Sequence, residues 1–183
     1  MKVFGLAGWS GSGKTTLLAR LIPELRGRGL SVSTVKHAHH AFDLDQPGKD
    51  SHTHRQAGAT EVLISSGLRW ALMHELRGAE EPPLAELLGR MSPVDLVLVE
   101  GFKRAALPKL EIHRPALGKP LLAVDDPMIV AIASDSAHLP VDHLPVGRPL
   151  LPLGDTARIA DFILAHLDAL SHQPPAPAPA LAG

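Results

Sequence analysis

The stretch Gly8-Trp-Ser-Gly-Ser-Gly-Lys-Thr-Thr16 fits the pattern G-x-x-x-x-G-K-S/T and predicts a phosphate-binding P-loop. Glycine lets the backbone turn tightly and aim successive N–H groups at phosphate oxygens, while the helix that follows contributes its positive end. We therefore expect the whole stretch to bind a nucleotide: Gly8, Trp9, Ser10, Gly11, Ser12, Gly13, Lys14, Thr15 and Thr16.

Two side chains of this stretch have distinct expected roles. Lys14 would reach the β- and γ-phosphates and act in any catalysis at the site. Thr15 would place its hydroxyl on Mg²⁺, a hard cation that takes oxygen ligands in octahedral geometry. The motif thus predicts a nucleoside triphosphate with its magnesium ion.

The flanks of the motif provide the strand–loop–helix context that a P-loop needs. Residues 3–7 form a short apolar run typical of a buried strand, and leucines recur at helical spacing over residues 17–25. Pro23 removes one helix hydrogen bond and clashes with the preceding turn, so we expect the helix to bend or end early there.

Hydrophobic periodicity predicts the remaining elements. The predicted strands cover residues 31–36, 60–65, 69–74, 94–100, 109–113 and 128–133, and the predicted helices cover 84–91 and 157–170. Because 69–74 follows 60–65 after a Ser-Gly turn, the two should form a hairpin. The predicted fold class is α/β, a P-loop NTPase-type three-layer sandwich with a mostly parallel central sheet and an antiparallel hairpin extension.

Composition narrows the class of protein. The 183 residues are 45% hydrophobic, which suits one domain over residues 1–170, followed by a Pro/Ala-rich, extended or disordered tail over 171–183. The formal net charge of -1 gives no basic field, so we expect no nucleic-acid partner. There is no cysteine, and no apolar run approaches the ~20 residues that span a bilayer. We expect a cytoplasmic protein without a membrane partner.

Glu100 is the second candidate site residue. It ends the nearly continuous apolar run over residues 94–99, which is typical of a central parallel strand covered on both faces. Open α/β sheets bind ligands at the carboxyl edge, where this carboxylate would lie. We expect Glu100 to hold Mg²⁺, directly or through water, or to orient a hydrolytic water; the alternative is a solvated charge at a strand end.

The polar stretch over residues 37–55 offers further ligands. Asp50, favoured over Asp43, could complete the magnesium shell, and solvated turn chemistry is the alternative for both. The histidines of this stretch could instead bind a transition metal, contact anionic groups or face water; they are His37, His39, His40, His52 and His54.

Ser134 and Asp135 follow the last predicted strand and are candidates for reading the base. A carboxylate can accept two hydrogen bonds from guanine, but the N-K-x-D pattern is absent and a turn role competes. Lys103 and Arg104 form a short basic loop after Glu100 that would meet a phosphorylated ligand or face water.

Six segments, in this order, resemble the MobB family of molybdopterin-guanine dinucleotide biosynthesis adaptors. They are the P-loop stretch, Val35-Lys-His-Ala-His-His40, Asp43-Leu-Asp-Gln-Pro-Gly-Lys-Asp-Ser51, Arg69-Trp-Ala-Leu-Met73, Leu98-Val-Glu-Gly-Phe-Lys103 and Ala131-Ile-Ala-Ser-Asp135. The resemblance extends to about Leu170 and does not include the tail.

The resemblance implies a homodimer that binds GTP with Mg²⁺ and is at most a weak GTPase acting as an adaptor. It implies a MobA-type molybdenum cofactor guanylyltransferase as partner and molybdopterin as a candidate ligand. Two alternatives stay open at this point. A small-molecule kinase would need a base such as Asp43 or Asp50, and a nickel-insertion GTPase would use the histidines.

Overall fold

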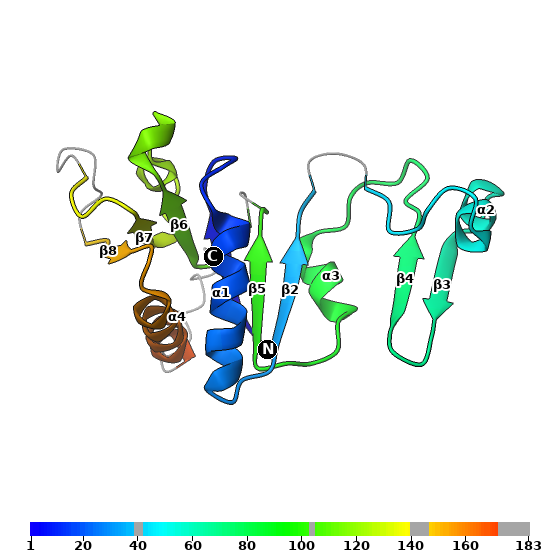
Figure 1. Cartoon of the computed structure of the whole chain (residues 1–183), viewed down its shortest axis with the longest axis horizontal. Helices are drawn as coiled ribbons and strands as arrows, with labels where there is room; N and C mark the ends of the chain where they lie inside the picture. Colours follow the sequence, from blue (N-terminus) through cyan, green and yellow to red (C-terminus); the bar gives the residue numbers. More distant parts are fainter. Residues whose placement is uncertain (39–41, 103–104, 140–146, 172–183) are drawn as a thin grey trace, which may run out of the picture. The chain divides into compact units, whose positions relative to one another are not determined.

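The computed structural model describes residues 1–38, 42–102, 105–139 and 147–171. These residues belong to two compact units (Figure 1). The first unit is Met1–His37 with Ser92–Gly183, and the second unit is Ala38–Met91. The assignment of residues 1–170 to one domain stays a prediction, and residues 172–183 of the expected tail lie outside the described part. Within the described residues, no helix is both long and apolar enough to cross a bilayer.

A six-stranded sheet forms the centre of the first unit. Its strands are β1 (Lys2–Ala7), β2 (Val32–Lys36), β5 (Leu96–Glu100), β6 (Lys109–His113), β7 (Ile129–Ser134) and β8 (Leu150–Pro152). Their order is β2-β5-β1-β6-β7-β8, and every neighbouring pair is parallel. The predicted parallel sheet is confirmed, while β8 was not predicted because three residues carry too little periodicity.

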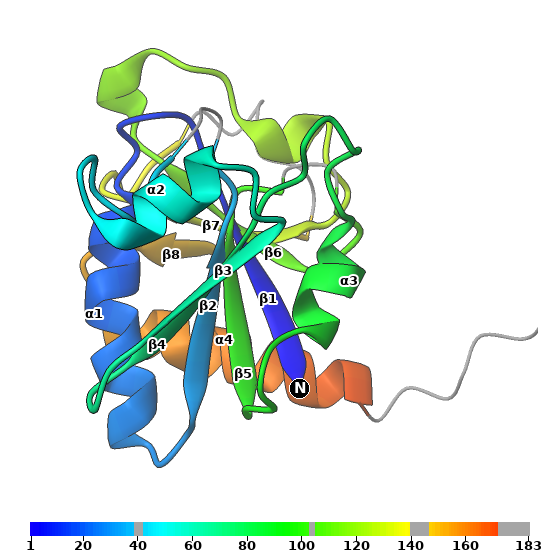
Figure 2. The ribbon, with the colours of Figure 1, turned by 90° about the vertical axis from the view of Figure 1, so that its right-hand side faces the viewer.

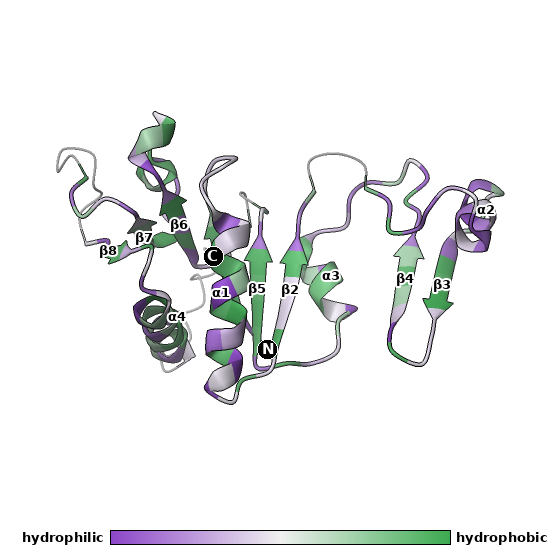
Figure 3. Cartoon of the chain, viewed as in Figure 1, coloured by the Kyte–Doolittle hydropathy of each residue, from purple (hydrophilic) through white to green (hydrophobic). Residues whose placement is uncertain are grey.

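Strand register gathers polar side chains at one edge of this sheet. Leu6 of β1 pairs with Glu100 of β5, and Ala7 pairs with Glu111 of β6. β5 is hydrophobic along its length and hydrophilic at its tip (Figure 3). Because all six strands run the same way, the P-loop after β1 begins beside the end of β5.

Helices α1 (Lys14–Gly27) and α4 (Thr156–Ser171) pack on one face of the sheet (Figure 2). The buried leucines of α1 and the apolar stripe of α4 enclose Phe4 and Leu6 of β1. Asp155 accepts a hydrogen bond from the Arg158 amide at 3.0 Å, and this contact caps the N-terminus of α4.

The expected early end of the first helix at Pro23 is wrong. The helix continues through Pro23 to Gly27. Leu21 and Leu25, on either side of the proline, are fully buried in the core, and this packing outweighs the lost hydrogen bond. Pro23 itself is exposed, so its ring displaces no core side chain.

The opposite face carries a smaller apolar cluster and a buried polar row. The cluster consists of Ala7, Leu121, Ala123, Ile129, Ile132 and Leu139. Two short 3₁₀ helices, η1 (Pro115–Leu117) and η2 (Leu122–Val124), follow β6. The inward side chains of β6 on this face are Lys109, Glu111 and His113, all buried. A buried charged group requires a partner, and Lys109 Nζ lies 2.7 Å from Asp126 Oδ2.

The second unit contains α2 (Asp50–Gln56), β3 (Glu61–Ser65), β4 (Trp70–His74) and α3 (Leu84–Gly89). β3 and β4 form the predicted antiparallel hairpin, with Leu63 opposite Leu72 and Ser65 opposite Trp70. The hairpin is a separate two-stranded sheet and not part of the central parallel sheet.

Candidate functional site

The P-loop joins β1 to α1 with a backbone that only glycine accommodates at its first position. Gly8 has a φ of +145°, and a Cβ there would lie 2.6 Å from both the Ile112 carbonyl oxygen and Ser12 Oγ. The Ser12 amide closes the turn by donating to the Trp9 carbonyl at 3.1 Å. Ser10 and Gly11 lie exposed at the tip of the loop, and Thr16 lies exposed in the first turn of α1.

Lys14 is held across the loop. Its ammonium donates to the Gly8 carbonyl at 2.9 Å and to the Trp9 carbonyl at 3.0 Å. These contacts keep a positive charge beside the N-terminal end of α1, whose first amides lack helical acceptors. The arrangement is suited to an anion such as a phosphate group.

Thr15 and Glu100, both expected to hold Mg²⁺, lie close together. The Thr15 hydroxyl lies 3.3 Å from Glu100 Oε1 and 3.5 Å from Oε2. A hydroxyl and a carboxylate are both oxygen ligands of the kind that Mg²⁺ prefers, and the ion usually keeps several waters besides. These two residues therefore fit a magnesium ion at this edge of the sheet.

Ser12 adds a buried hydroxyl under the loop. The residue is 1% exposed, and within the described residues its Oγ has no hydrogen-bond partner. A buried unpaired hydroxyl costs free energy that a ligand or water could recover. Ser12 was expected at the site only as a member of the motif.

Arg114 lies beside the P-loop and was not among the residues predicted from the sequence. It directly follows β6, and a Cβ placed on Gly13 would lie 3.3 Å from Arg114 Nη2 and 3.6 Å from Nε. Its guanidinium therefore lies against the residue that precedes Lys14. No local pattern marks Arg114, because only the pairing of β6 with β1 brings it to the P-loop.

The roof segment, defined as Arg114–Pro120, approaches the P-loop at three further points. Trp9 Nε1 donates to the Pro120 carbonyl at 2.8 Å, and a Cβ on Gly11 would lie 3.9 Å from Leu117 Cδ2. Lys119 Nζ lies 5.8 Å from the centre of the Trp9 ring, within range of a cation–π interaction. The roof segment and the P-loop thus form one continuous surface.

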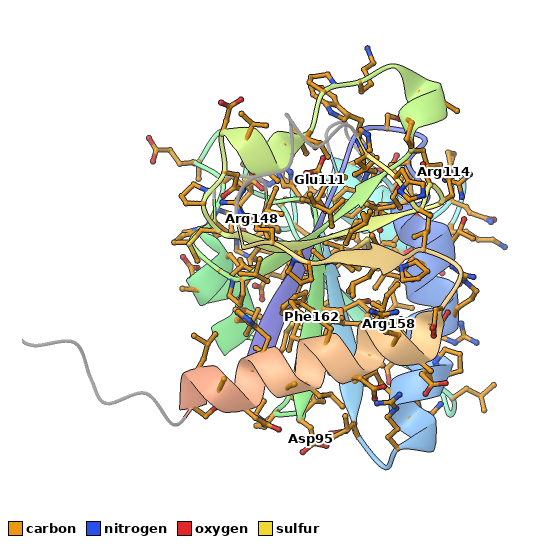
Figure 4. All side chains as sticks on the ribbon, turned by 90° about the vertical axis from the view of Figure 1, so that its left-hand side faces the viewer. Asp95, Glu111, Arg114, Arg148, Arg158 and Phe162 are labelled. Carbon is orange, nitrogen blue, oxygen red and sulfur yellow. The ribbon has the colours of Figure 1, made fainter. Side chains whose placement is uncertain are left out.

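Glu111 holds the start of η2, which follows the roof segment. Its carboxylate accepts hydrogen bonds from the amides of Leu122 and Ala123, both at 2.8 Å. Burial raises the pKa of Glu111 above its usual range, and the two amides and the charges of His113 and Arg148 oppose that shift. Glu111 and Arg148 are labelled in Figure 4, near the end of the sheet where Arg114 lies.

Ser134 and Asp135 take part in a turn and an ion pair. Ser134 is buried, and its hydroxyl oxygen accepts the Ser136 amide at 3.1 Å. Asp135 Oδ2 lies 3.7 Å from Arg114 Nε. The contact of Ser134 is typical of a turn, which was the alternative to base recognition. Base recognition by either residue stays a prediction.

The second unit holds the predicted acidic residues. Asp50 is the first residue of α2, where its negative charge interacts favourably with the helix dipole. Asp43 lies 2.8 Å from Arg55 Nη2 in an ion pair. The magnesium role of Asp50 stays a prediction.

The histidines are divided between the units. His37 donates its amide to the Glu100 carbonyl at 2.8 Å, and its ring lies 4.8 Å from that of Phe102. His52 and His54 lie on α2, whereas His39 and His40 are outside the described residues, as are Lys103 and Arg104. Among the residues that the structure does describe, no three His, Asp or Glu side chains are grouped for a metal ion.

Comparisons with known proteins agree with this geometry. The family model for MobB, molybdopterin guanine dinucleotide synthesis protein B, matches residues 3–135. The molybdopterin-guanine dinucleotide biosynthesis adapter protein of Escherichia coli is 44% identical over 165 residues, which are 88% of this chain and 91% of that protein. The adapter protein of the same name from Haemophilus influenzae is 41% identical over 162 residues, covering 88% and 86%.

A solved structure supports the same assignment. The crystal structure of a molybdopterin-guanine biosynthesis protein B (mobB) superposes with a TM-score of 0.69 at 29% identity, over 90% of this chain and 99% of that one. These matches give no support to a small-molecule kinase or a nickel-insertion GTPase. With its P-loop, its parallel sheet and these relatives, the chain belongs to the MobB family.

Proposed function

We propose that this chain binds GTP with Mg²⁺ at the P-loop and acts as an adaptor in molybdopterin-guanine dinucleotide biosynthesis. The observation that carries the proposal is the approach of Thr15 Oγ1 to within 3.3 Å of the Glu100 carboxylate, beside the Lys14 ammonium. This arrangement provides a positive charge for the phosphates and oxygen ligands for the metal at one site. The choice of GTP over ATP rests on family membership, since the contacts among the described residues do not select a nucleobase.

Each residue has a defined task in the proposed complex. The loop amides and Lys14 bind the β- and γ-phosphates, while Thr15 and Glu100 hold Mg²⁺, which would neutralise phosphate charge. Glu100, half-buried at the end of β5, also lies where it could orient a water. Hydrolysis in this proposal is slow and secondary to binding, so the chain works as a switchable adaptor and at most as a weak GTPase.

The partner in this proposal is a MobA-type molybdenum cofactor guanylyltransferase, which would attach GMP to molybdopterin. The proposal includes a homodimer in the cytoplasm and molybdopterin as a candidate ligand. The names of the Escherichia coli and Haemophilus influenzae relatives support the pathway, since both are adapter proteins of molybdopterin-guanine dinucleotide biosynthesis.

Calorimetric titration with GTP and ATP, each with and without Mg²⁺, tests the nucleotide. We expect tighter binding of GTP, strengthened by Mg²⁺. Lys14→Ala should abolish measurable binding while leaving the unfolding midpoint nearly unchanged, because the lysine donates to the carbonyls of Gly8 and Trp9 in the loop rather than packing in the core. Lys2→Ala is the matched control: it removes the same charge at the other end of β1, where Lys2 pairs with Asp168.

Preference for ATP, or normal GTP binding by Lys14→Ala, would contradict the proposal. Glu100→Gln tests the metal separately. It should reduce the gain in GTP affinity that Mg²⁺ provides and spare binding without metal. An equal magnesium effect in both proteins would remove Glu100 from the metal site.

A further inference from the structure

Arg114 lies at the P-loop with an unused hydrogen-bonding group. Its side chain is 40% exposed, but Nε is buried and, within the described residues, has no hydrogen-bond acceptor. Asp135 Oδ2 lies 3.7 Å from that nitrogen, which is beyond hydrogen-bonding distance. The pair is therefore a Coulombic contact that leaves a buried N–H donor unsatisfied.

The backbone that carries Arg114 is held at both ends of the roof segment. Arg114 directly follows the buried strand β6, and its carbonyl accepts the Leu117 amide at 3.0 Å as η1 begins. At the other end of the roof segment, the Pro120 carbonyl accepts Trp9 Nε1 at 2.8 Å. A charge that is held before the ligand arrives costs little to reorganise on binding.

We propose that Arg114 binds a phosphate oxygen of the nucleotide held by the P-loop. The inference rests on the proposed nucleotide binding and adds a second positively charged residue, besides Lys14, at the triphosphate. Arg114 Nη2 lies 3.3 Å from where a Cβ of Gly13 would be, and the amides after Gly13 are those that a P-loop turns toward phosphates. A guanidinium fork matches phosphate oxygens and donates two parallel hydrogen bonds.

Asp135 has a positioning role in this arrangement. Its carboxylate holds the Arg114 side chain near Gly13 until a phosphate provides a stronger partner. Two other roles for Arg114 are outcomes of the test. It could contact the guanine base, or it could only neutralise Asp135, whose negative charge would otherwise repel phosphates.

The test measures affinity for inorganic tripolyphosphate and for GTP by calorimetry, with the whole chain. Tripolyphosphate carries no base, so it reports phosphate contacts alone. Arg114→Ala should weaken binding of both ligands by the same factor, about 10- to 100-fold for the loss of one charge-assisted contact. Arg114→Lys should recover part of the loss, because it keeps the charge without the fork.

Two controls separate the outcomes. Arg158→Ala removes an arginine from α4, which is well separated from Arg114 (Figure 4), and should change neither affinity. The double variant Arg114→Ala/Asp135→Ala should stay as weak toward tripolyphosphate as Arg114→Ala. Circular dichroism and the unfolding midpoint should show that each variant is folded.

Four results would overturn the inference. Unchanged tripolyphosphate affinity in Arg114→Ala, or a loss confined to GTP, would exclude a phosphate contact. Wild-type affinity in the double variant would mean that Arg114 only masks Asp135. If the wild-type chain bound neither ligand, the proposed nucleotide binding would fail together with this inference, whereas the first three results leave that function intact.

Discussion

The two units of this chain are stabilised in different ways. In the first unit, β5 lies between two other strands and its four apolar residues Leu96–Val99 are fully buried or nearly so. In the second unit, β3 and β4 pair only with each other, and Leu63 is 60% and Trp70 65% exposed. A two-stranded hairpin is marginal by itself, so this unit needs other sources of stability.

Charge pairing is one such source in the second unit. Arg55 contacts three carboxylates, with Asp43 and Asp45 each at 2.8 Å and Glu75 at 3.6 Å. These contacts hold Arg55 within its own unit. The comparison indicates why the P-loop belongs to the first unit: a phosphate site needs donors held by a packed core.

Removal of Phe4 should have the largest effect on stability. The ring is fully buried in the core between the sheet and α4. Phe4→Ala should lower the free energy of unfolding by about 3–5 kcal/mol, measured by denaturant titration. Phe4→Leu, which keeps most of the volume, should cost less than about 1.5 kcal/mol. Equal losses in both variants would show that packing at this position is loose.

Removal of Arg55 should loosen only the second unit. Its loss leaves the buried Asp45 carboxylate without the partner that lowers its pKa. In Arg55→Ala, amide hydrogen exchange should accelerate over residues 42–77 and stay unchanged in β5. Arg90→Ala is the control, because it breaks an exposed pair with Glu86 in the same unit. Accelerated exchange in β5 as well would contradict a role of Arg55 confined to the second unit.

A pH-dependent contribution to stability should come from His166 in the first unit. Burial near Phe4 and Phe162 lowers its pKa below the usual 6.5. The unfolded chain therefore binds a proton first as the pH falls, so this contribution is complete above pH 6.5 and lost as the pH falls through the lowered pKa. The difference in unfolding free energy between wild type and His166→Gln should shrink over that window and be constant at alkaline pH. A constant difference at every pH would refute the assignment.

Replacement of Trp70 should have the smallest effect. The side chain lies on the exposed face of the hairpin, opposite Ser65. Trp70→Ser should change the unfolding free energy by no more than about 0.5 kcal/mol. A larger loss that grows with protein concentration would mean that another copy of the chain covers this face.

Local signals in the sequence were enough to select much of the candidate site. The P-loop pattern identified Gly8–Thr16, and an apolar run ending on a carboxylate identified Glu100, because strand burial and motif spacing are properties of short segments. The hairpin was predicted as well, from two alternating segments joined by a Ser-Gly turn. Pro23 shows the limit of this reasoning, since tertiary packing kept its helix intact.

The sequence by itself determined the P-loop, the parallel sheet and the family resemblance, since each depends on the order and spacing of neighbouring residues. Only the tertiary structure placed Arg114 against Gly13, put Asp135 beside Arg114 and enclosed Arg55 among carboxylates. These contacts join residues on different elements. They depend on which strands are neighbours and in which register those strands pair. Hydrophobic periodicity along one segment does not specify either.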